Sequence, residues 1–284
     1  MVTSVSTSPA SKHGLHAHSN EALTTHHKRP AAILGFGPAG NGKTTLLNLI
    51  FETICSKRSE KQNAPVVRVE MSKIILWGKG RHGPLGKLVD QHIHLIAQGR
   101  YLPDEVINPL LAAWMDEHQE RHSSELYIIG GLPRTVGQLT EVKHRFSRIA
   151  AIMQPVDQET SFRSIRERWH KAKMSGKAGE LRPDDAGGES VLEERWSEHC
   201  LHTPHIVSKL NGALINLDRS VSLTARLTEV FKKLKEMNEA SPIPTSALRK
   251  CITRLGQGNH PIHSLIKEVE SPKPRAQTEI TFTA

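Results

Sequence analysis

The chain has 284 residues, enough for one large domain or two small ones, and its 4% aromatic content predicts a mainly aliphatic core. A net charge of +9 favours anionic partners such as nucleotides or nucleic acids. Cys55, Cys200 and Cys251 form no C-x-x-C pair, which argues against a zinc ribbon and a disulfide framework. With no apolar run as long as a membrane helix and no signal-peptide centre, we expect a soluble, cytoplasmic protein that does not bind membranes.

The predicted elements alternate between strands and helices along the chain. Apolar runs predict strands at 31–36, 66–70, 126–129, 148–153 and 213–217. Helical spacing of apolar residues predicts helices at 45–54, 85–98, 103–114, 158–173, 189–210 (with a break near Pro204) and 223–237. This alternation predicts an α/β fold with a parallel sheet covered on both faces.

The two ends of the chain differ from this pattern. Residues 1–30 are rich in Ser, Thr and His, and we expect a disordered tail there; its histidines lack the fixed spacing of a metal site. Residues 238–284 are interrupted by prolines and predict a largely flexible basic tail, with a weak helix near 245–255. The ordered domain is therefore expected at 31–237.

A phosphate-loop pattern, G-x-x-x-x-G-K-[ST], lies between the first strand and the first helix. Its residues are Gly37, Pro38, Ala39, Gly40, Asn41, Gly42, Lys43 and Thr44. Glycines let backbone N–H groups converge on an anion, and the helix N-terminus adds partial positive charge. We expect Lys43 to reach the β- and γ-phosphates of ATP and the Thr44 hydroxyl to help hold Mg²⁺. A glycine turn used only for packing is the weaker alternative, because both flanks fit the motif.

Arginines gather at further positions. Arg134 follows the strand at 126–129, and ligands of parallel sheets bind beyond the carboxyl ends of the strands. Arg163, Arg166 and Arg168 share one predicted helix, and Arg182 and Arg195 follow a glycine-containing loop. These arginines are either a solvated charged face or part of a loop that closes over a nucleotide, holds the transferring phosphates and excludes water.

From about residue 31 to 231 the chain resembles the adenylate kinases, within the nucleoside monophosphate kinases. The matching segments are the phosphate loop, Pro84-Leu85-Gly86-Lys87, Gly99-Arg100-Tyr101-Leu102-Pro103-Asp104-Glu105, Gly131-Leu132-Pro133-Arg134-Thr135 with Gln138, and Arg182-Pro183-Asp184-Asp185 with Glu194-Arg195. They occur in the family's order and spacing. The resemblance implies a P-loop three-layer sandwich with a five-stranded parallel sheet. It also implies a helical insert at about 71–114 that binds a nucleoside monophosphate (NMP), and a short lid at about 169–181 without a zinc site.

The resemblance also implies roles for individual residues, with ATP and Mg²⁺ as cofactors. The residues that hold the transferring phosphates would be Lys43, Arg134, Arg168, Arg182 and Arg195. ATP would be bound by residues 37–44 and Thr45, and the acceptor by Gly131, Arg134 and Gln138, of which Gln138 would read the acceptor adenine.

Three positions depart from the family pattern. Leu76 stands where an arginine for the acceptor phosphate is expected, with Lys73, Lys79 and Arg81 nearby as replacements. Gly130 replaces an aspartate that helps to organise Mg²⁺ through water. Thr44 replaces a glycine, and its hydroxyl would partly offset the missing aspartate.

These features predict a monomeric kinase that transfers the γ-phosphoryl group of ATP to a nucleoside monophosphate, with AMP as the first candidate. Because of Leu76 and Gly130, the alternative is a catalytically weak or inactive, nucleotide-binding regulatory protein of the same fold. A third interpretation, nucleic-acid binding through the basic tail, rests on charge alone and is the least favoured.

Overall fold

A computed structural model describes residues 29–55, 66–122, 124–176 and 187–240. Its sheet has five parallel strands in the order β2-β3-β1-β4-β5. The strands are β1 (Ala31–Phe36), β2 (Val66–Glu70), β3 (Leu126–Gly130), β4 (Arg148–Met153) and β5 (Leu214–Asn216). The α/β class and the five-stranded parallel sheet are thereby confirmed.

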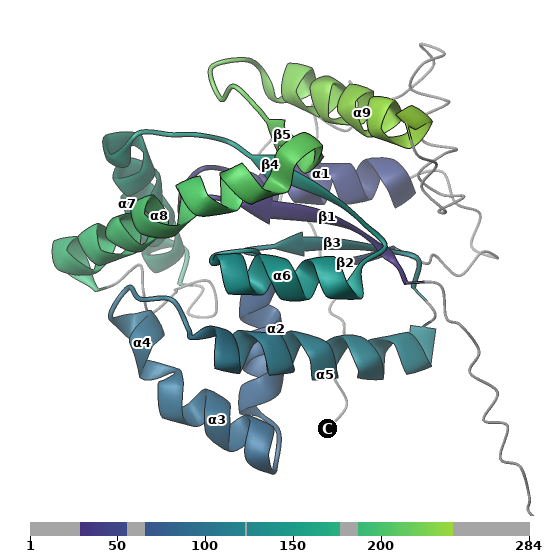
Figure 1. Ribbon diagram of the computed structural model, residues 1–284. Coiled ribbons are helices and arrows are strands. Elements are labelled where there is room, and N and C mark those ends of the chain that lie inside the picture. The colour runs from purple at the N-terminus through teal and green to yellow at the C-terminus, as the bar shows by residue number, and fades with distance from the viewer. Residues whose placement is uncertain (1–28, 56–65, 123, 177–186, 241–284) are drawn as a thin grey trace, which may run out of the picture.

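Helices cover both faces of the sheet because the side chains of β1 alternate between them. Ala31 and Ile33 pack into one apolar cluster with α1 (Lys43–Cys55) and α9 (Leu223–Ala240). Figure 1 shows these two helices on one side of the sheet and α2, α5 and α6 on the other. The central strand is therefore buried on both faces, as the apolar run at 31–36 indicated.

The second face of the sheet carries a separate apolar cluster. Ala32 and Leu34 of β1 belong to it, together with residues of the helices between β2 and β3. Those helices are α2 (Met71–Lys79), α3 (Pro84–His92), α4 (His94–Ala97) and α5 (Asp104–His122). The remaining helices are α6 (Val136–Arg145), α7 (Gln158–Met174) and α8 (Gly188–Leu210), followed by a short 3₁₀ turn, η3 (Asn211–Ala213). None of the helices in the described ranges is long and apolar enough to cross a bilayer.

Two helix predictions were wrong in detail. The helix expected at 85–98 is divided at Ile93 into α3 and α4, and the N–H of Ile96 bonds to the carbonyl of Ile93 at 3.2 Å in a tighter turn. Leu95 still packs on the same cluster as Leu88, so the apolar spacing continues across the break. The break expected near Pro204 is absent, since α8 runs through it. Pro204 has no N–H, so the helical hydrogen bond to the carbonyl of Cys200 is missing. Cys200 is exposed, so water can bond to that carbonyl instead.

The other boundaries differ by a few residues, and some predictions cannot be compared. The last strand is shorter than 213–217 because residue 213 belongs to η3, and α9 continues past the predicted end at 237 to Ala240. The tails at 1–28 and 241–284, Arg182 and the lid segment 177–181 lie outside the described residues. The acceptor-binding role of the segment 71–114 stays a prediction.

Replacing Leu110 with alanine should lower the free energy of unfolding by about 2–5 kcal/mol, the usual loss for truncating a buried leucine. Leu110 is fully buried on α5, and its Cδ1 would lie only 2.3 Å from a Cβ placed on Gly78 of α2. Urea titration followed by circular dichroism measures the change. Leu201→Ala, at an exposed position of α8, is the control and should change stability by less than about 0.5 kcal/mol. Equal losses in the two variants would contradict the packing of α5 against α2.

Candidate functional site

The phosphate loop connects β1 to α1 and is pressed against α7. Gly40 has φ +74°, and a Cβ there would lie 2.6 Å from the backbone oxygen of Ser161, so only glycine fits without a shift. The Ser161 hydroxyl donates to the carbonyl of Ala39 at 2.8 Å. The loop that the motif predicted is thus present, with α1 starting directly at Lys43.

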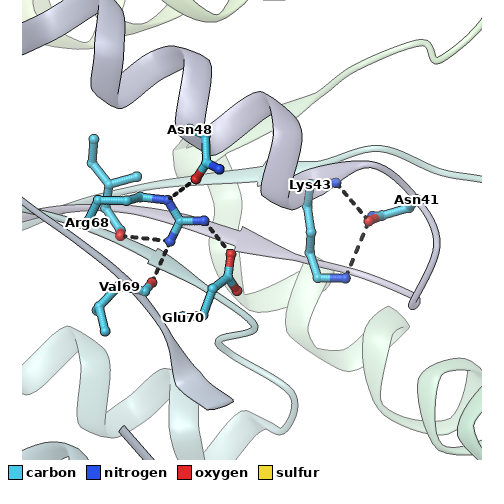
Figure 2. A network of polar contacts seen from close by, with 7 residues as sticks. Asn41, Lys43, Asn48, Arg68, Val69 and Glu70 are labelled. Atoms are coloured by element: carbon cyan, nitrogen blue, oxygen red, sulfur yellow. Dashed lines mark hydrogen bonds and ion pairs between the residues drawn. The ribbon is translucent and has the colours of Figure 1, made fainter. Parts of the chain in front are cut away.

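The side chain of Asn41 holds the loop from the inside. It is fully buried, and its Nδ2 donates to the carbonyl of Gln154 at 3.3 Å and, at 3.5 Å, to that of Phe36. Its Oδ1 accepts from the backbone N–H of Lys43 at 3.2 Å and from the Lys43 ammonium at 3.3 Å, as Figure 2 shows. The ammonium also donates to the carbonyl of Pro38 at 2.8 Å, so it lies back over the loop.

Buried hydrogen-bond donors without a partner lie next to this loop. Within the described residues, Gln154 Nε2, Arg219 Nη1 and Arg226 Nε are such atoms. These three side chains lie close to one another. Arg226 donates to Gln154 Oε1, and the pKa of Arg226 is lowered, mainly by burial and also by the charge of Arg219. Gln154 Nε2 would lie 3.9 Å from a Cβ on Gly42. Buried donors are rarely left unpaired, so this edge of the loop fits an anion such as a nucleotide phosphate.

A small cavity of about 10 Å³ lies beside the first glycine of the loop. Residues lining it include Gly37 of the loop, Tyr101, Arg134 and His199. The Arg134 guanidinium lies 4.8 Å above the Tyr101 ring, and burial raises the pKa of Tyr101 against the opposing charges of Arg134 and Arg195. The structure therefore brings the predicted Arg134 and Arg195 close to one tyrosine at the wall of this cavity.

His199 of α8 was not predicted to belong to the site. Burial, and then the charge of Lys43, lower the pKa of its imidazole to about 4, so the ring is neutral at pH 7. Its Nδ1 lies 2.7 Å from the Thr203 hydroxyl, one turn further along α8. No motif marks this histidine, because only the packing of α8 against the loop places it near Lys43.

Gln138 lies inside the turn that carries Arg134. Its side-chain oxygen accepts from the backbone N–H of Arg134 at 2.8 Å, and the residue is 2% exposed. Thr135 caps α6 by accepting from the Gln138 N–H at 3.1 Å, and donates to Asp104 at 2.6 Å. The N–H of Gly131 donates to the carbonyl of Gly35 at 2.8 Å, next to the loop. These contacts fix the position of Arg134, and the reading of adenine by Gln138 stays a prediction.

The other predicted arginine in the described residues, Arg168, is half-buried on α7. It follows Ser161, which contacts the loop, by two helical turns and so lies on the same face of α7. In the segment predicted to bind the acceptor, Leu76 is 58% exposed on α2. Arg81 bonds to Glu117 at 2.5 Å and stacks on Trp77, so it does not take the place of the missing arginine; Lys73 and Lys79 are exposed.

A carboxylate lies at the carboxyl end of β2, where Glu70 pairs with Arg68. Within the described residues, no three His, Cys, Asp or Glu side chains form a group that could hold a metal ion by themselves. Mg²⁺ does not need such a group, since it keeps several waters and is held by one or two carboxylates together with substrate phosphates. Glu70 and the half-buried Thr44 are oxygen donors that fit this requirement.

Comparisons with known proteins identify no family. No protein-family model matches the chain, and a search of the curated proteins found no match. Among solved structures, the chain is similar to a gluconokinase from Sinorhizobium meliloti 1021, with 17% identity and a TM-score of 0.44, over 75% of this chain and 96% of that chain. A likeness of this size does not carry a functional assignment.

The half-buried His199 should make the protein less stable as the pH falls. Its folded pKa of about 4 lies below the ordinary value of 6.5, so the unfolded chain binds the proton more readily, and stability is lost as the pH falls from 6.5 toward 4. His199→Gln removes this contribution, so its free energy of unfolding, measured by urea titration from pH 7.5 to 4.5, should depend less on pH than that of the wild type. His205→Gln, at an exposed position of the same helix, should keep the wild-type slope. Parallel slopes for wild type and His199→Gln would contradict the burial of a neutral His199.

Proposed function

We propose that the chain is a kinase that transfers the γ-phosphoryl group of ATP to a nucleoside monophosphate, with AMP as the first candidate. The observation that supports the proposal is the closeness of two parts of the chain that we expect to bind phosphate. The loop with Lys43 and the turn with Arg134 border one cavity, and Arg195 lies against its wall. One part suits the donor phosphates and the other suits the acceptor phosphate.

The reaction would depend on positioning and charge. An acceptor phosphate oxygen bonds to the γ-phosphorus while the bond from that phosphorus to the β–γ bridging oxygen breaks. Lys43 would exchange its contacts to Pro38 and Asn41 for phosphate oxygens, and the arginines would spread charge over the transferred group. Mg²⁺, held by the donor phosphates and the Thr44 hydroxyl, would neutralise negative charge there. An acceptor phosphate already carries its nucleophilic charge, so no general base is required.

His199 would add a neutral wall to this cavity. A neutral imidazole beside Lys43 does not compete with the ammonium for phosphate charge, and its burial with Tyr101 helps to exclude water. Water would otherwise accept the phosphoryl group. We further infer that the protein is a monomer and that it acts in the cytoplasm. The free thiols of Cys55 and Cys200 support a reducing compartment such as the cytoplasm.

The second candidate is a nucleotide-binding regulatory protein of the same fold. The exposed Leu76 favours it, because no arginine on α2 replaces the missing contact to the acceptor phosphate. In this case the donor site would be used and the acceptor site would not.

Assays with ATP and each of AMP, CMP, UMP and GMP test the choice between the two functions. We expect diphosphate formation to be fastest with AMP, because the resemblance assigns an adenine-reading role to Gln138. Product is measured by separating the nucleotides chromatographically, and ATP binding is measured in parallel. Tight ATP binding with no diphosphate from any acceptor would overturn the kinase proposal and support the regulatory one.

Lys43→Met should lower kcat by about 10²–10³-fold, the loss expected when a donor that stabilises transition-state charge is removed. The substitution keeps an unbranched side chain that is one atom shorter, and it removes the charge. Steady-state rates with the best acceptor measure the change. Lys232→Met, at an exposed position of α9, is the matched control and should turn over like the wild type. Wild-type turnover by Lys43→Met would exclude the phosphate loop as the donor site.

A further inference from the structure

We propose that Glu70 supplies, from the end of β2, the carboxylate for Mg²⁺-bound water that Gly130 at the end of β3 does not provide. The inference rests on the donor half of the proposed function, the binding of a magnesium-bound nucleoside triphosphate.

Glu70 lies in the row of residues that leads into the phosphate loop. In the parallel ladder, Glu70 pairs with Gly130, and Gly130 pairs with Gly35, two residues before Gly37. Neighbouring strands are about 4.8 Å apart, so these three residues line up across the carboxyl edge of the sheet. The N–H of Gly131 bonds to the carbonyl of Gly35 at 2.8 Å and keeps β3 against β1 at this edge.

The carboxylate of Glu70 fills the space that a side chain at position 130 would need. A Cβ on Gly130 would lie 2.1 Å from Glu70 Oε2 and 2.4 Å from its Oε1. Any side chain there would therefore force the carboxylate to move and disturb its pairing with Arg68. The end of β3 lacks an acid of its own, but the neighbouring strand places one directly above it.

Arg68 fixes the orientation of this carboxylate. Its guanidinium pairs with Glu70 Oε1, and it also donates to Asn48 Oδ1 at 3.1 Å and to the carbonyl of Val69 at 2.5 Å. Figure 2 shows the guanidinium between Asn48 and Glu70. Glu70 Oε2 makes no hydrogen bond within the described residues, and the side chain is 22% exposed. One oxygen is thus held, and the other is able to accept a hydrogen bond from water.

The contact with Asn48 directs the pair toward the start of α1. Asn48 follows Thr44 by four residues, so the two side chains lie on the same face of the helix, one turn apart. The hydroxyl predicted to hold Mg²⁺ and the Glu70 carboxylate therefore face the same region beside the loop. A carboxylate that accepts hydrogen bonds from metal-bound water is a common outer-shell partner and affects metal affinity strongly.

Glu70→Gln tests the proposal without any acceptor. The probe is Mn²⁺, titrated by electron paramagnetic resonance in the presence of a non-hydrolysable ATP analogue. We expect the Mn²⁺ affinity to fall about 10–100-fold, the usual effect of losing an outer-shell partner. Nucleotide binding measured in EDTA should stay at the wild-type value. Glu117→Gln, which removes another carboxylate paired with an arginine, is the matched control and should bind Mn²⁺ normally. Wild-type Mn²⁺ affinity in folded Glu70→Gln, with only a lower melting temperature, would show that Glu70 is a purely structural partner of Arg68.

An exchange of positions provides an independent test if Glu70→Gln folds poorly. Gly130→Asp alone should destabilise the protein, because the new side chain meets the Glu70 carboxylate. In Glu70→Ala/Gly130→Asp the clash is gone and the acid returns to β3, so the Mn²⁺ affinity should exceed that of Glu70→Ala by about tenfold or more. Equal affinities in these two variants would overturn the proposal. These results are separate from the acceptor assays: a protein that phosphorylates no acceptor could still bind Mn²⁺ through Glu70.

Discussion

The buried amide of Asn41 determines the shape of the loop on which the site is built. It bonds to the carbonyl that ends β1 and to Gln154 after β4, and it receives both the backbone N–H and the ammonium of Lys43. Both anchors belong to the core, because β1 is buried along its whole length and Gln154 is buried as well. The loop therefore presents its backbone donors from a rigid base, which favours preorganised binding of phosphate.

Charge is distributed unevenly around this loop. Arg134 lines the cavity, and the charges of Arg195 and Lys43 act on Tyr101 and His199, which also line it. Arg219 and Arg226 lie instead after β5 and in α9. The guanidiniums of Arg219 and Arg226 are half-buried, and the charge of Arg219 opposes that of Arg226, with Asp218 as a partial counter-charge. Each also has one buried N–H without a partner, which favours an anion at this edge of the loop. The arrangement suits a ligand with several phosphates. Binding such a ligand would explain part of the positive charge of the chain, so nucleic-acid binding is not needed to explain it.

The departures from the adenylate kinase pattern have different consequences. At Gly130 the missing acid is matched by Glu70, whose carboxylate occupies the same space from the next strand. At Leu76 there is no such match, because Arg81 is held by Glu117 and Trp77. If the proposed function holds, the donor side is therefore the more complete half of the candidate site, and the chain departs most from the adenylate kinase pattern on the acceptor side.

The sequence by itself determined the strands, most helices and the phosphate loop, since these depend on local spacing of apolar residues and glycines. It also indicated Arg134, because the end of a parallel strand is a known ligand position. Only the tertiary structure revealed where Glu70 and His199 lie. Glu70 meets Gly130 across the sheet from 60 residues away, and His199 reaches Lys43 through the packing of α8. Such neighbours come together through strand pairing and helix docking, which no local pattern encodes.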